Sequence, residues 1–158
     1  MKHIIALIGF LLVSFSAAAI GGIATGSAPE FYASLSRPDW APPSSVFGPV
    51  WTVLYILMAV AAWLVWREKG LAGARVPLTL FVVQLVLNAI WSWLFFAWQR
   101  GSLAQIEIVV LWMMIALTII AFWRVRPIAG MLLLPYLAWV TYAAALTFSL
   151  VRRNPALF

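Results

Sequence analysis

Long apolar runs separated by short polar connections dominate the chain from end to end. A helix needs roughly 20 residues to cross the hydrocarbon core of a bilayer, and five of the runs reach that length. Backbone groups must satisfy each other in lipid, and the chain lacks the short alternating segments of a barrel. The pattern predicts an all-α integral membrane protein, a five-transmembrane-helix bundle. The expected spans are residues 4–24, 46–66, 76–98, 103–123 and 128–151.

The first run admits a second interpretation. Lys2, the apolar stretch and the small residues at 16–19 resemble a secretory signal peptide with its cleavage site. Apolar sequence continues through Ile23, however, which favours a membrane span. No internal repeat is evident and the number of spans is odd, which disfavours a repeat-built transporter. We therefore expect residues 1–158 to form a single membrane domain.

One connection, residues 25–45, is much longer than the others. It contains Pro29, Pro38, Pro42 and Pro43 together with charged and aromatic side chains. Prolines restrict the backbone, so we expect a stiff loop without a regular helix. Composition leaves two interpretations open, a lid over a space between the helices or a tight connector.

The composition excludes most soluble functions. Of 158 residues, 66% are apolar and 9% charged, against about 45–50% and about 25% in soluble domains. The absence of cysteine and the single histidine, His3, exclude thiolate or histidine metal sites, cysteine nucleophiles and a serine–histidine–aspartate triad. We therefore expect no metal site.

Basic residues lie between the apolar runs and give a net charge of +6. This distribution suits lipid headgroups and does not form the continuous stripe that nucleic acid requires. The side of the N-terminus holds six of them and the other side four, and the positive-inside rule therefore predicts a cytoplasmic N-terminus with the long loop outside. The six are Lys2, Arg67, Lys69, Arg75, Arg124 and Arg126. The four are Arg37, Arg100, Arg152 and Arg153.

Polar and aromatic residues share one helical face in the third run. Gln84, Asn88, Trp91, Ser92 and Phe95 follow the spacing i, i+4, i+7, i+8 and i+11. An amide inside a membrane faces protein or a cavity, because lipid offers it no partner. Two interpretations stay open: hydrogen bonds between helices, worth about 0.6 kcal/mol each, or a pocket wall with a few orienting donors.

Aromatic stripes recur in the second and fifth runs. Trp51 and Tyr55 share a face in the second run, as do Trp139 and Ala143 in the fifth, where Pro135 permits a kink. Such stripes are more often core packing, but indole faces also suit a flat apolar ligand.

Glu107 is the acidic residue inside the fourth run. Carboxyl groups within a membrane are often functional, as in proton or cation carriers. Its position near an interface favours a structural role, with local pairing to Arg100 or to lipid headgroups.

Several strings together resemble a known family. They are Tyr32-Ala-Ser-Leu-Ser-Arg37-Pro-Asp-Trp40-Ala-Pro-Pro43 followed by Phe47, Trp51 and Tyr55, then Gln84…Asn88…Trp91-Ser92…Phe95-Phe96, and Pro135-Tyr-Leu-Ala-Trp139. In these positions the chain is similar to the tryptophan-rich sensory protein / translocator protein family (TspO/MBR, also called the peripheral-type benzodiazepine receptor family). The resemblance covers nearly the whole chain.

The resemblance implies a five-helix bundle, commonly a homodimer, with a pocket closed by the first loop. Family members bind porphyrins and related tetrapyrroles, sterols, and benzodiazepine-type or isoquinoline drugs. We expect no cofactor beyond a porphyrin or haem-type tetrapyrrole as ligand, and we add Arg37 as a partner for its acid groups by charge complementarity. The ligand-contact positions carry over as Tyr32, Trp51, Asn88, Trp91, Ser92, Phe95, Trp139, Ala143 and Leu146.

Three functions follow from the resemblance. The leading one is a membrane receptor or sensor that binds porphyrins in an intramembrane pocket. The alternatives are a light- and oxygen-dependent porphyrin-degrading enzyme, with Trp51 and Trp139 as catalytic residues, and a porphyrin or sterol carrier that uses Glu107. Many members have Leu-Asn where this chain has Leu146-Thr147, and the sterol motif ending at Arg152 lacks its tyrosine, so sterol recognition is less secure than porphyrin binding.

Overall fold

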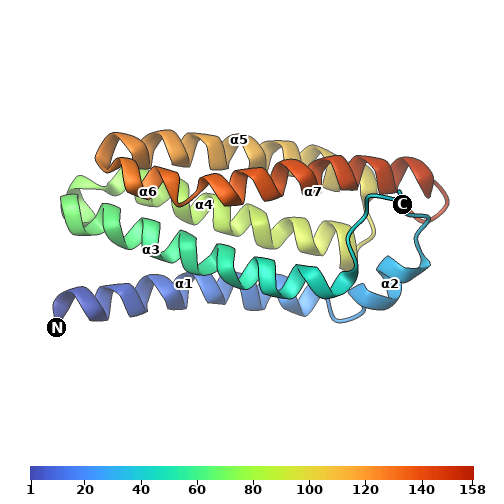
Figure 1. The fold of residues 1–158 in the computed structure, drawn as a ribbon, viewed down its shortest axis with the longest axis horizontal. Helices are drawn as coiled ribbons and strands as arrows, with labels where there is room; N and C mark the ends of the chain where they lie inside the picture. Colours follow the sequence, from blue (N-terminus) through green and yellow to red (C-terminus); the bar gives the residue numbers. More distant parts are fainter.

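The computed structural model describes residues 1–158 and consists of helices joined by short connections (Figure 1). The elements in chain order are α1 (Lys2–Ala24), α2 (Ala28–Ser34), the 3₁₀ turn η1 (Ser44–Val46), α3 (Phe47–Gly73), α4 (Arg75–Ser92), the π-helical turn η2 (Trp93–Ala97), α5 (Gly101–Val125), α6 (Pro127–Met131) and α7 (Leu134–Arg153).

Five segments are long and apolar enough to cross a membrane, which confirms the predicted number and order of spans. They run alternately in opposite directions, so that the N-terminus lies at one end of the bundle and α2 at the other (Figure 1). α1 packs against α3 and α4, α4 packs against α5, and α5 packs against α6 and α7. The protein is thus a multi-pass, all-helical membrane bundle.

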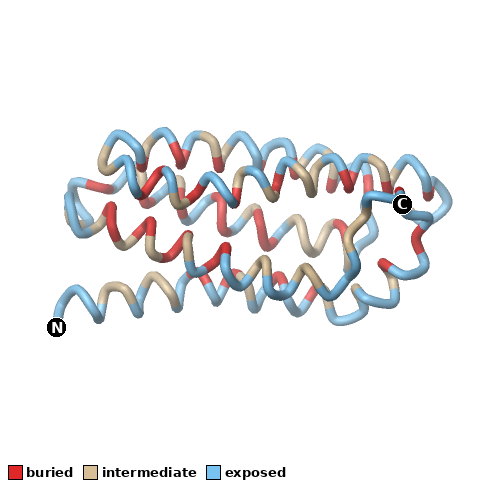
Figure 2. The backbone as a smooth tube through the Cα atoms, in the orientation of Figure 1, coloured by how far each residue is buried: buried red, intermediate tan, exposed pale blue.

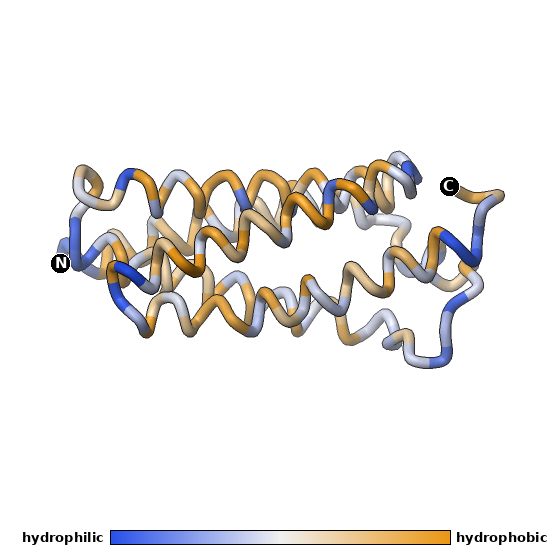
Figure 3. Tube along the Cα trace, turned by 90° about the horizontal axis from the view of Figure 1, so that it is seen from above, coloured by the Kyte–Doolittle hydropathy of each residue, from blue (hydrophilic) through white to orange (hydrophobic).

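Apolar side chains cover the outside of the bundle as well as its interior. Buried residues recur along the helices other than the first half of α1, where every residue is exposed or intermediate (Figure 2), while apolar positions extend over most of the length of the spans (Figure 3). Met58, Phe81 and Phe122 lie at the centre of the largest core cluster. Because lipid tails are as apolar as leucine, close packing and polar contacts hold such helices together, more than burial does.

Two indole N–H groups fasten α1, the helix with the least buried surface. Trp63 Nε1 donates to the carbonyl oxygen of His3 at 2.9 Å, near the start of α1. Trp93 Nε1 donates to the carbonyl oxygen of Ile20 at 3.1 Å, near its end. These bonds join α1 to α3 and η2 at opposite ends of the helix.

The segment between α1 and α3 corrects one prediction. We expected no regular helix there, yet it contains the seven-residue helix α2 and the turn η1. Pro29 lies in the first turn of α2, where a helix needs no backbone N–H and proline is well tolerated. The prolines at 38, 42 and 43 fall in the irregular part, as their restricted backbone requires.

This segment, residues 25–46, is bound to the end of the bundle and is called the lid below. Buried Asn154, after α7, accepts a bond from Ser36 N at 2.8 Å and donates from Nδ2 to Ser36 O at 3.1 Å. The same Nδ2 donates to Leu150 O at 2.8 Å. Tyr142 of α7 donates to the carbonyl oxygen of Trp40 at 2.9 Å. These contacts hold the segment against the end of α7.

Three spans are locally irregular. In the second, α3 is kinked near its end at Gly70, whose φ of 65° lies in the region that favours glycine. The fifth is divided into α6 and α7, with Pro135 in the first turn of α7, as the expected kink required. The third ends in the π-helical turn η2, in which Trp98 N donates to Trp93 O at 2.8 Å, five residues back. A π-helical turn inserts one extra residue and rotates the side chains that follow it.

Replacing Asn154 with alanine is expected to release the lid while the bundle stays folded. The change removes the bonds to the backbone N–H and the carbonyl oxygen of Ser36, which lowers the stability of the attached lid by about 1–3 kcal/mol. Amide hydrogen exchange at residues 35–37 should accelerate by roughly 5- to 150-fold. The exposed neighbour Arg153→Ala serves as the control, and unchanged exchange in the Asn154 variant would contradict the role of this side chain.

Gly130→Ala is expected to lower the thermal unfolding midpoint in detergent. A Cβ at Gly130 would lie 2.8 Å from Trp123 Cε3 and 3.2 Å from Ile119 O, so that α6 would have to move away from α5. Overpacking of this kind costs about 1–3 kcal/mol. Gly9→Ala is the control, because a Cβ there meets nothing within 4 Å and alanine favours a helix. Equal midpoints for the two variants would show that the close approach is unimportant.

Candidate functional site

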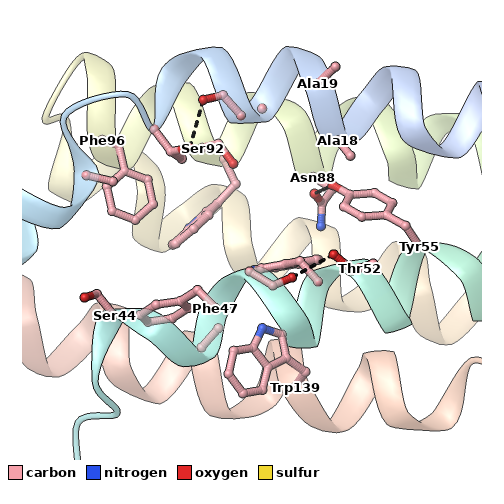
Figure 4. A pocket seen from close by; sticks show the side chains of 18 of the residues that line it. Ala18, Ala19, Ser44, Phe47, Thr52, Tyr55, Asn88, Ser92, Phe96 and Trp139 are labelled. Atoms are coloured by element: carbon pink, nitrogen blue, oxygen red, sulfur yellow. Dashed lines mark hydrogen bonds between the residues drawn. The ribbon is translucent and has the colours of Figure 1, made fainter.

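A cavity of about 580 Å³ lies at the lid end of the bundle, lined by α1, α3, α4, η2, α7 and the lid (Figure 4). Its volume falls within the roughly 300–1,000 Å³ typical of small-molecule sites. Its walls consist of Phe15, Ala18, Ala19, Gly21, Gly22, Thr25, Ala28, Pro29, Tyr32, Ser44, Phe47, Gly48, Trp51, Thr52, Tyr55, Asn88, Trp91, Ser92, Phe96, Trp139 and Ala143.

Small residues of α1 make room for this cavity. Ala18, Gly21 and Gly22 form part of its wall. A Cβ added to Gly21 would lie 3.2 Å from Ser92 Oγ and 3.7 Å from Ala89 Cα, so α1 and α4 approach closely there. The short side chains thus join α1 to α4 on one side and leave space toward α3 on the other.

A chain of hydrogen bonds joins three helices beside the cavity. Tyr55 Oη of α3 donates to Asn88 Oδ1 of α4 at 2.7 Å, and Asn88 Nδ2 donates to Tyr136 Oη of α7 at 3.0 Å. All three side chains are buried, and Figure 4 shows Asn88 and Tyr55 side by side at the cavity wall. Asn88 therefore has both of the roles considered for its amide. It forms hydrogen bonds between helices, and it forms part of the cavity wall.

Two indoles approach the cavity from different helices. Trp51 of α3 lies with its ring centroid 5.6 Å from that of Tyr55 and 6.1 Å from that of Tyr136. Trp139 extends from α7, with its ring centroid 6.0 Å from that of Phe47 (Figure 4). Both offer flat aromatic surface, which is suited to stacking against a planar ligand.

A third indole contributes an available hydrogen-bond donor. Trp91 stacks on Phe95 with ring centroids 5.1 Å apart and planes 12° from parallel. Its Nε1 is buried and has no hydrogen-bond partner. A buried donor without a partner is costly, and a ligand atom in the adjoining cavity would satisfy it.

Tyr32 is the buried aromatic residue that the lid contributes to the cavity wall. Its hydroxyl donates to the carbonyl oxygen of Pro42 at 2.9 Å, and its ring meets that of Phe47 edge to face at 5.5 Å. The guanidinium of Arg37 lies over the Tyr32 ring, 4.9 Å from its centroid. Burial raises the pKa of the Tyr32 phenol, and Arg37 opposes that shift. Tyr32 therefore stays a neutral donor at physiological pH.

The structure brings most of the predicted ligand-contact positions to this cavity. Those that line it are Tyr32, Trp51, Asn88, Trp91, Ser92, Trp139 and Ala143. Arg37, Phe95 and Leu146 do not line it. Arg37 lies in a surface hollow of the lid with Asp39, whereas Phe95 and Leu146 pack with Leu35 in a buried cluster beneath the lid. Contact between any of these residues and a ligand stays a prediction.

The π-helical turn explains why the polar stripe of the third span splits. Its prediction assumed a regular helix through Phe95, but η2 inserts an extra residue after Ser92. Phe96 therefore lines the cavity in place of Phe95. Gln84, one turn before Asn88, is buried away from the cavity, and its Nε2 donates to Met58 Sδ at 3.6 Å.

Several wall residues were not among the predicted sites. The contribution of α1 was missed because its wall residues before Thr25, Phe15 and the small residues that follow, carry no polar marker. Phe47 and Phe96 stand within the strings that carried the family resemblance, so a signal for them was present. Tyr136 holds Asn88 from outside the wall, and only the spatial arrangement reveals that role.

Glu107 corrects a second prediction. We expected its carboxylate to pair with Arg100 or with lipid headgroups, but both carboxyl oxygens are buried and have no hydrogen-bond partner. The ion pair that the structure contains is between Arg126 and Glu68, at 2.8 Å, at the end of the bundle opposite the lid.

Comparison with known proteins agrees with this architecture. The model of the TspO/MBR family matches residues 9–153. The chain is 41% identical to the "Tryptophan-rich protein TspO" of Chlorobaculum tepidum over 129 residues, 79% of this chain and 80% of that protein. It is 38% identical to the "Translocator protein" of Homo sapiens over 131 residues, 82% of this chain and 78% of that protein.

A third relative extends the match over nearly the whole bundle. It is the "Tryptophan-rich sensory protein" of Cereibacter sphaeroides, 37% identical over 147 residues, 91% of each chain. The residues that match the family model, 9–153, include the helices and the lid that line the cavity. The chain therefore belongs to the TspO/MBR family and is a multi-pass membrane protein of its receptor and sensor type.

Proposed function

We propose that this chain is a membrane receptor or sensor that binds porphyrins and related tetrapyrroles in the cavity beneath the lid. The observation that carries the proposal is the convergence of three indoles, Trp51, Trp91 and Trp139, on one cavity of about 580 Å³ that the lid helps to line. Such a space offers a large flat apolar ligand stacking surface on several sides. The names of the relatives, which include a sensory protein and a translocator protein, agree with a receptor function.

A few polar groups would orient the ligand. Trp91 Nε1 is a donor without a partner, and the Asn88 amide is held in a fixed orientation by Tyr55 and Tyr136. Fixed donors in an apolar cavity favour a ligand whose polar atoms lie at matching positions. Arg37 stacks on the Tyr32 ring outside the wall, so a porphyrin carboxylate would reach it only after a movement of the lid.

The same cavity suits other lipophilic ligands of similar size. We include sterols and benzodiazepine-type or isoquinoline compounds in the proposal, with tetrapyrroles as the preferred class because of the indole-rich wall. No further cofactor is required for binding. We also propose that the protein works as a homodimer, and that its N-terminus is cytoplasmic.

Asn88→Ala is expected to weaken porphyrin affinity about tenfold, which corresponds to about 1.4 kcal/mol. The change removes an orienting amide from the wall and releases the hydroxyls of Tyr55 and Tyr136. Affinity is measured by quenching of tryptophan fluorescence during titration with a dicarboxylic porphyrin. Gln84→Ala is the matched control, because it deletes a buried amide of the same helix that does not line the cavity. Equal losses in the two variants, or no loss in either, would contradict a cavity-wall role.

Porphyrin degradation is the second candidate function. Trp51 lies within about 6 Å of the rings of Tyr55 and Tyr136, and Trp139 lies beside Tyr142, so electron-rich rings adjoin both indoles. In such a reaction the light-excited porphyrin would be oxidised, and dioxygen would be the oxidant. A carrier function stays a third hypothesis, measured as porphyrin flux into sealed vesicles.

The double variant Trp51→Phe, Trp139→Phe is expected to bind porphyrin and to lose light-dependent bleaching of it, by at least about tenfold in rate. Phenylalanine keeps an aromatic face but is much harder to oxidise than indole. Bleaching is followed by absorbance under illumination in air. The control is Trp112→Phe, Trp123→Phe, which changes two lipid-exposed indoles outside the cavity. Bleaching that persists in the first variant would rule out these two residues as catalytic.

A further inference from the structure

The cavity is open on one side of the bundle. Some of the residues that line it are also exposed on the surface of the protein, and all of these belong to α1, α3 and the lid. None of the lining residues on α4, η2 and α7 is exposed. The exposed lining residues of the two helices are Phe15, Ala19, Gly22, Gly48 and Thr52. The cavity therefore opens between α1 and α3, and this opening, bordered by these five residues, is called the portal below.

Small residues keep the portal open. The rings of Phe15 and Tyr55 lie 6.1 Å apart and join α1 to α3 at its inner end. From this pair toward the lid, the lining residues of α1 are alanines and glycines as far as Thr25. A Cβ at Gly22 or Gly48 would have no other atom within 4 Å. The two helices thus border an open space here.

The portal lies at a depth where lipid surrounds the protein. Phe15 is nine residues before the end of α1 at Ala24, a distance of about 14 Å along the helix. The hydrocarbon core is about 30 Å thick, so the portal extends through the lid-side half of the bilayer. Its exposed neighbours on both helices are apolar, namely Leu12, Ile20, Ile23, Val53 and Ile56. The sequence has no Asp, Glu, Lys or Arg from residue 3 to 29 or from residue 40 to 66.

The hydroxyl groups at the portal do not require water. Thr25 Oγ1 donates to the carbonyl oxygen of Gly22 at 2.8 Å, and Thr52 Oγ1 donates to that of Gly48 at 2.9 Å (Figure 4). Each hydroxyl is satisfied by the backbone of its own segment, as polar groups in contact with hydrocarbon must be. An apolar molecule can therefore pass between α1 and α3 without leaving these hydroxyls unpaired.

We propose that the portal between α1 and α3 is the route by which lipophilic molecules exchange between the lid-side leaflet of the bilayer and the cavity, while the lid stays attached. Hydrocarbon is the medium outside the portal and the cavity is largely apolar, so a lipid acyl chain enters it when no other ligand is bound. The use of this route by tetrapyrroles rests on the proposed function, whereas the entry of an acyl chain does not.

A photoreactive lipid tests the portal without any other ligand. The full chain is placed in phosphatidylcholine vesicles that contain a phosphatidylcholine with a diazirine in one acyl chain. Illumination converts the diazirine to a carbene, which inserts into a neighbouring side chain, and mass spectrometry locates the label. Trp91 lines the cavity from α4 and should be labelled, with the lipid-exposed Trp112 of α5 as the internal reference. The double variant Gly22→Leu, Gly48→Leu fills the portal from both sides and should lose the label at Trp91 but not at Trp112.

Gly9→Leu is the matched control for this variant. Gly9 is an exposed glycine of α1 outside the cavity, and a Cβ there also meets no atom within 4 Å. Its label at Trp91 should equal that of the wild type. Ala19→Leu repeats the blocking test from α1 alone if the double variant fails to fold, because leucine is a good helix former.

Two labelling results would overturn the proposal. The first is a wild type without label at Trp91, which includes the case in which a second copy of the chain covers the portal. The second is a label at Trp91 that persists unchanged in the folded blocking variant, because lipid would then reach the cavity by another route.

Exchange kinetics test whether tetrapyrroles use the same route. A dicarboxylic porphyrin is supplied in lipid vesicles, and tryptophan quenching gives its association and dissociation rates. A blocked route raises the barrier in both directions, so both rates should fall at least about tenfold in Gly22→Leu, Gly48→Leu, while the Kd changes less than about threefold. Asn154→Ala, which releases the lid, should leave both rates unchanged. Unchanged rates in the double variant, or faster exchange in Asn154→Ala, would refute entry through the portal.

The two experiments separate this inference from the proposed function. If porphyrin fails to bind the wild type, the proposed function falls, and the lipid labelling still decides whether the portal admits an acyl chain. If porphyrin binds but Trp91 is not labelled, the portal falls and the proposed function stands.

Discussion

The hydrogen-bonded chain from Tyr55 through Asn88 to Tyr136 is the contact on which the rest of the structure depends. Lipid provides no hydrophobic force that drives apolar helices together, and a polar group inside the membrane must find a partner in the protein. The Asn88 amide meets this requirement by bonding to α3 and α7 at once. The separation of these helices is thereby set beside the cavity, while the small side chains of α1 leave the remaining space unfilled. A cavity and a fixed polar group in its wall are thus two results of one constraint.

The lid completes the enclosure through a different kind of contact. Its backbone is irregular at residues 35–43, and polar side chains from the end of α7 satisfy part of it: Asn154 bonds to the Ser36 peptide unit and Tyr142 to Trp40. These bonds lie at the end of the bundle, where water competes for them, so each contributes modestly to stability. The walls are consequently held more firmly than the roof.

The sequence predicted the fold well because hydrophobic length determines the spans directly, and the five observed helices follow the apolar runs. It predicted part of the site because Asn88 is polar in an apolar helix and so marks the face that turns inward. Phe95 was placed on that face by helical periodicity, and the π-helical turn after Ser92 replaced it with Phe96. Helix α2 was missed because the effect of Pro29 depends on whether it falls in the first turn. The unpaired state of Glu107 depends on what surrounds it in three dimensions, which spacing along the chain does not reveal.

Five buried side-chain atoms have no hydrogen-bond partner, and among the residues that carry them only Trp91 lines the cavity. A buried polar group without a hydrogen bond costs about 1–3 kcal/mol, and a charged one costs more. Trp91 lines the cavity, whereas Ser14, Gln84 and Glu107 do not. If Trp91 served packing alone, phenylalanine would provide an aromatic face without an orphan donor. The indole N–H is understandable when a polar atom of a ligand in the cavity accepts a hydrogen bond from it. On this argument the wall of the cavity is less stable when empty than when a ligand with a suitably placed acceptor fills it.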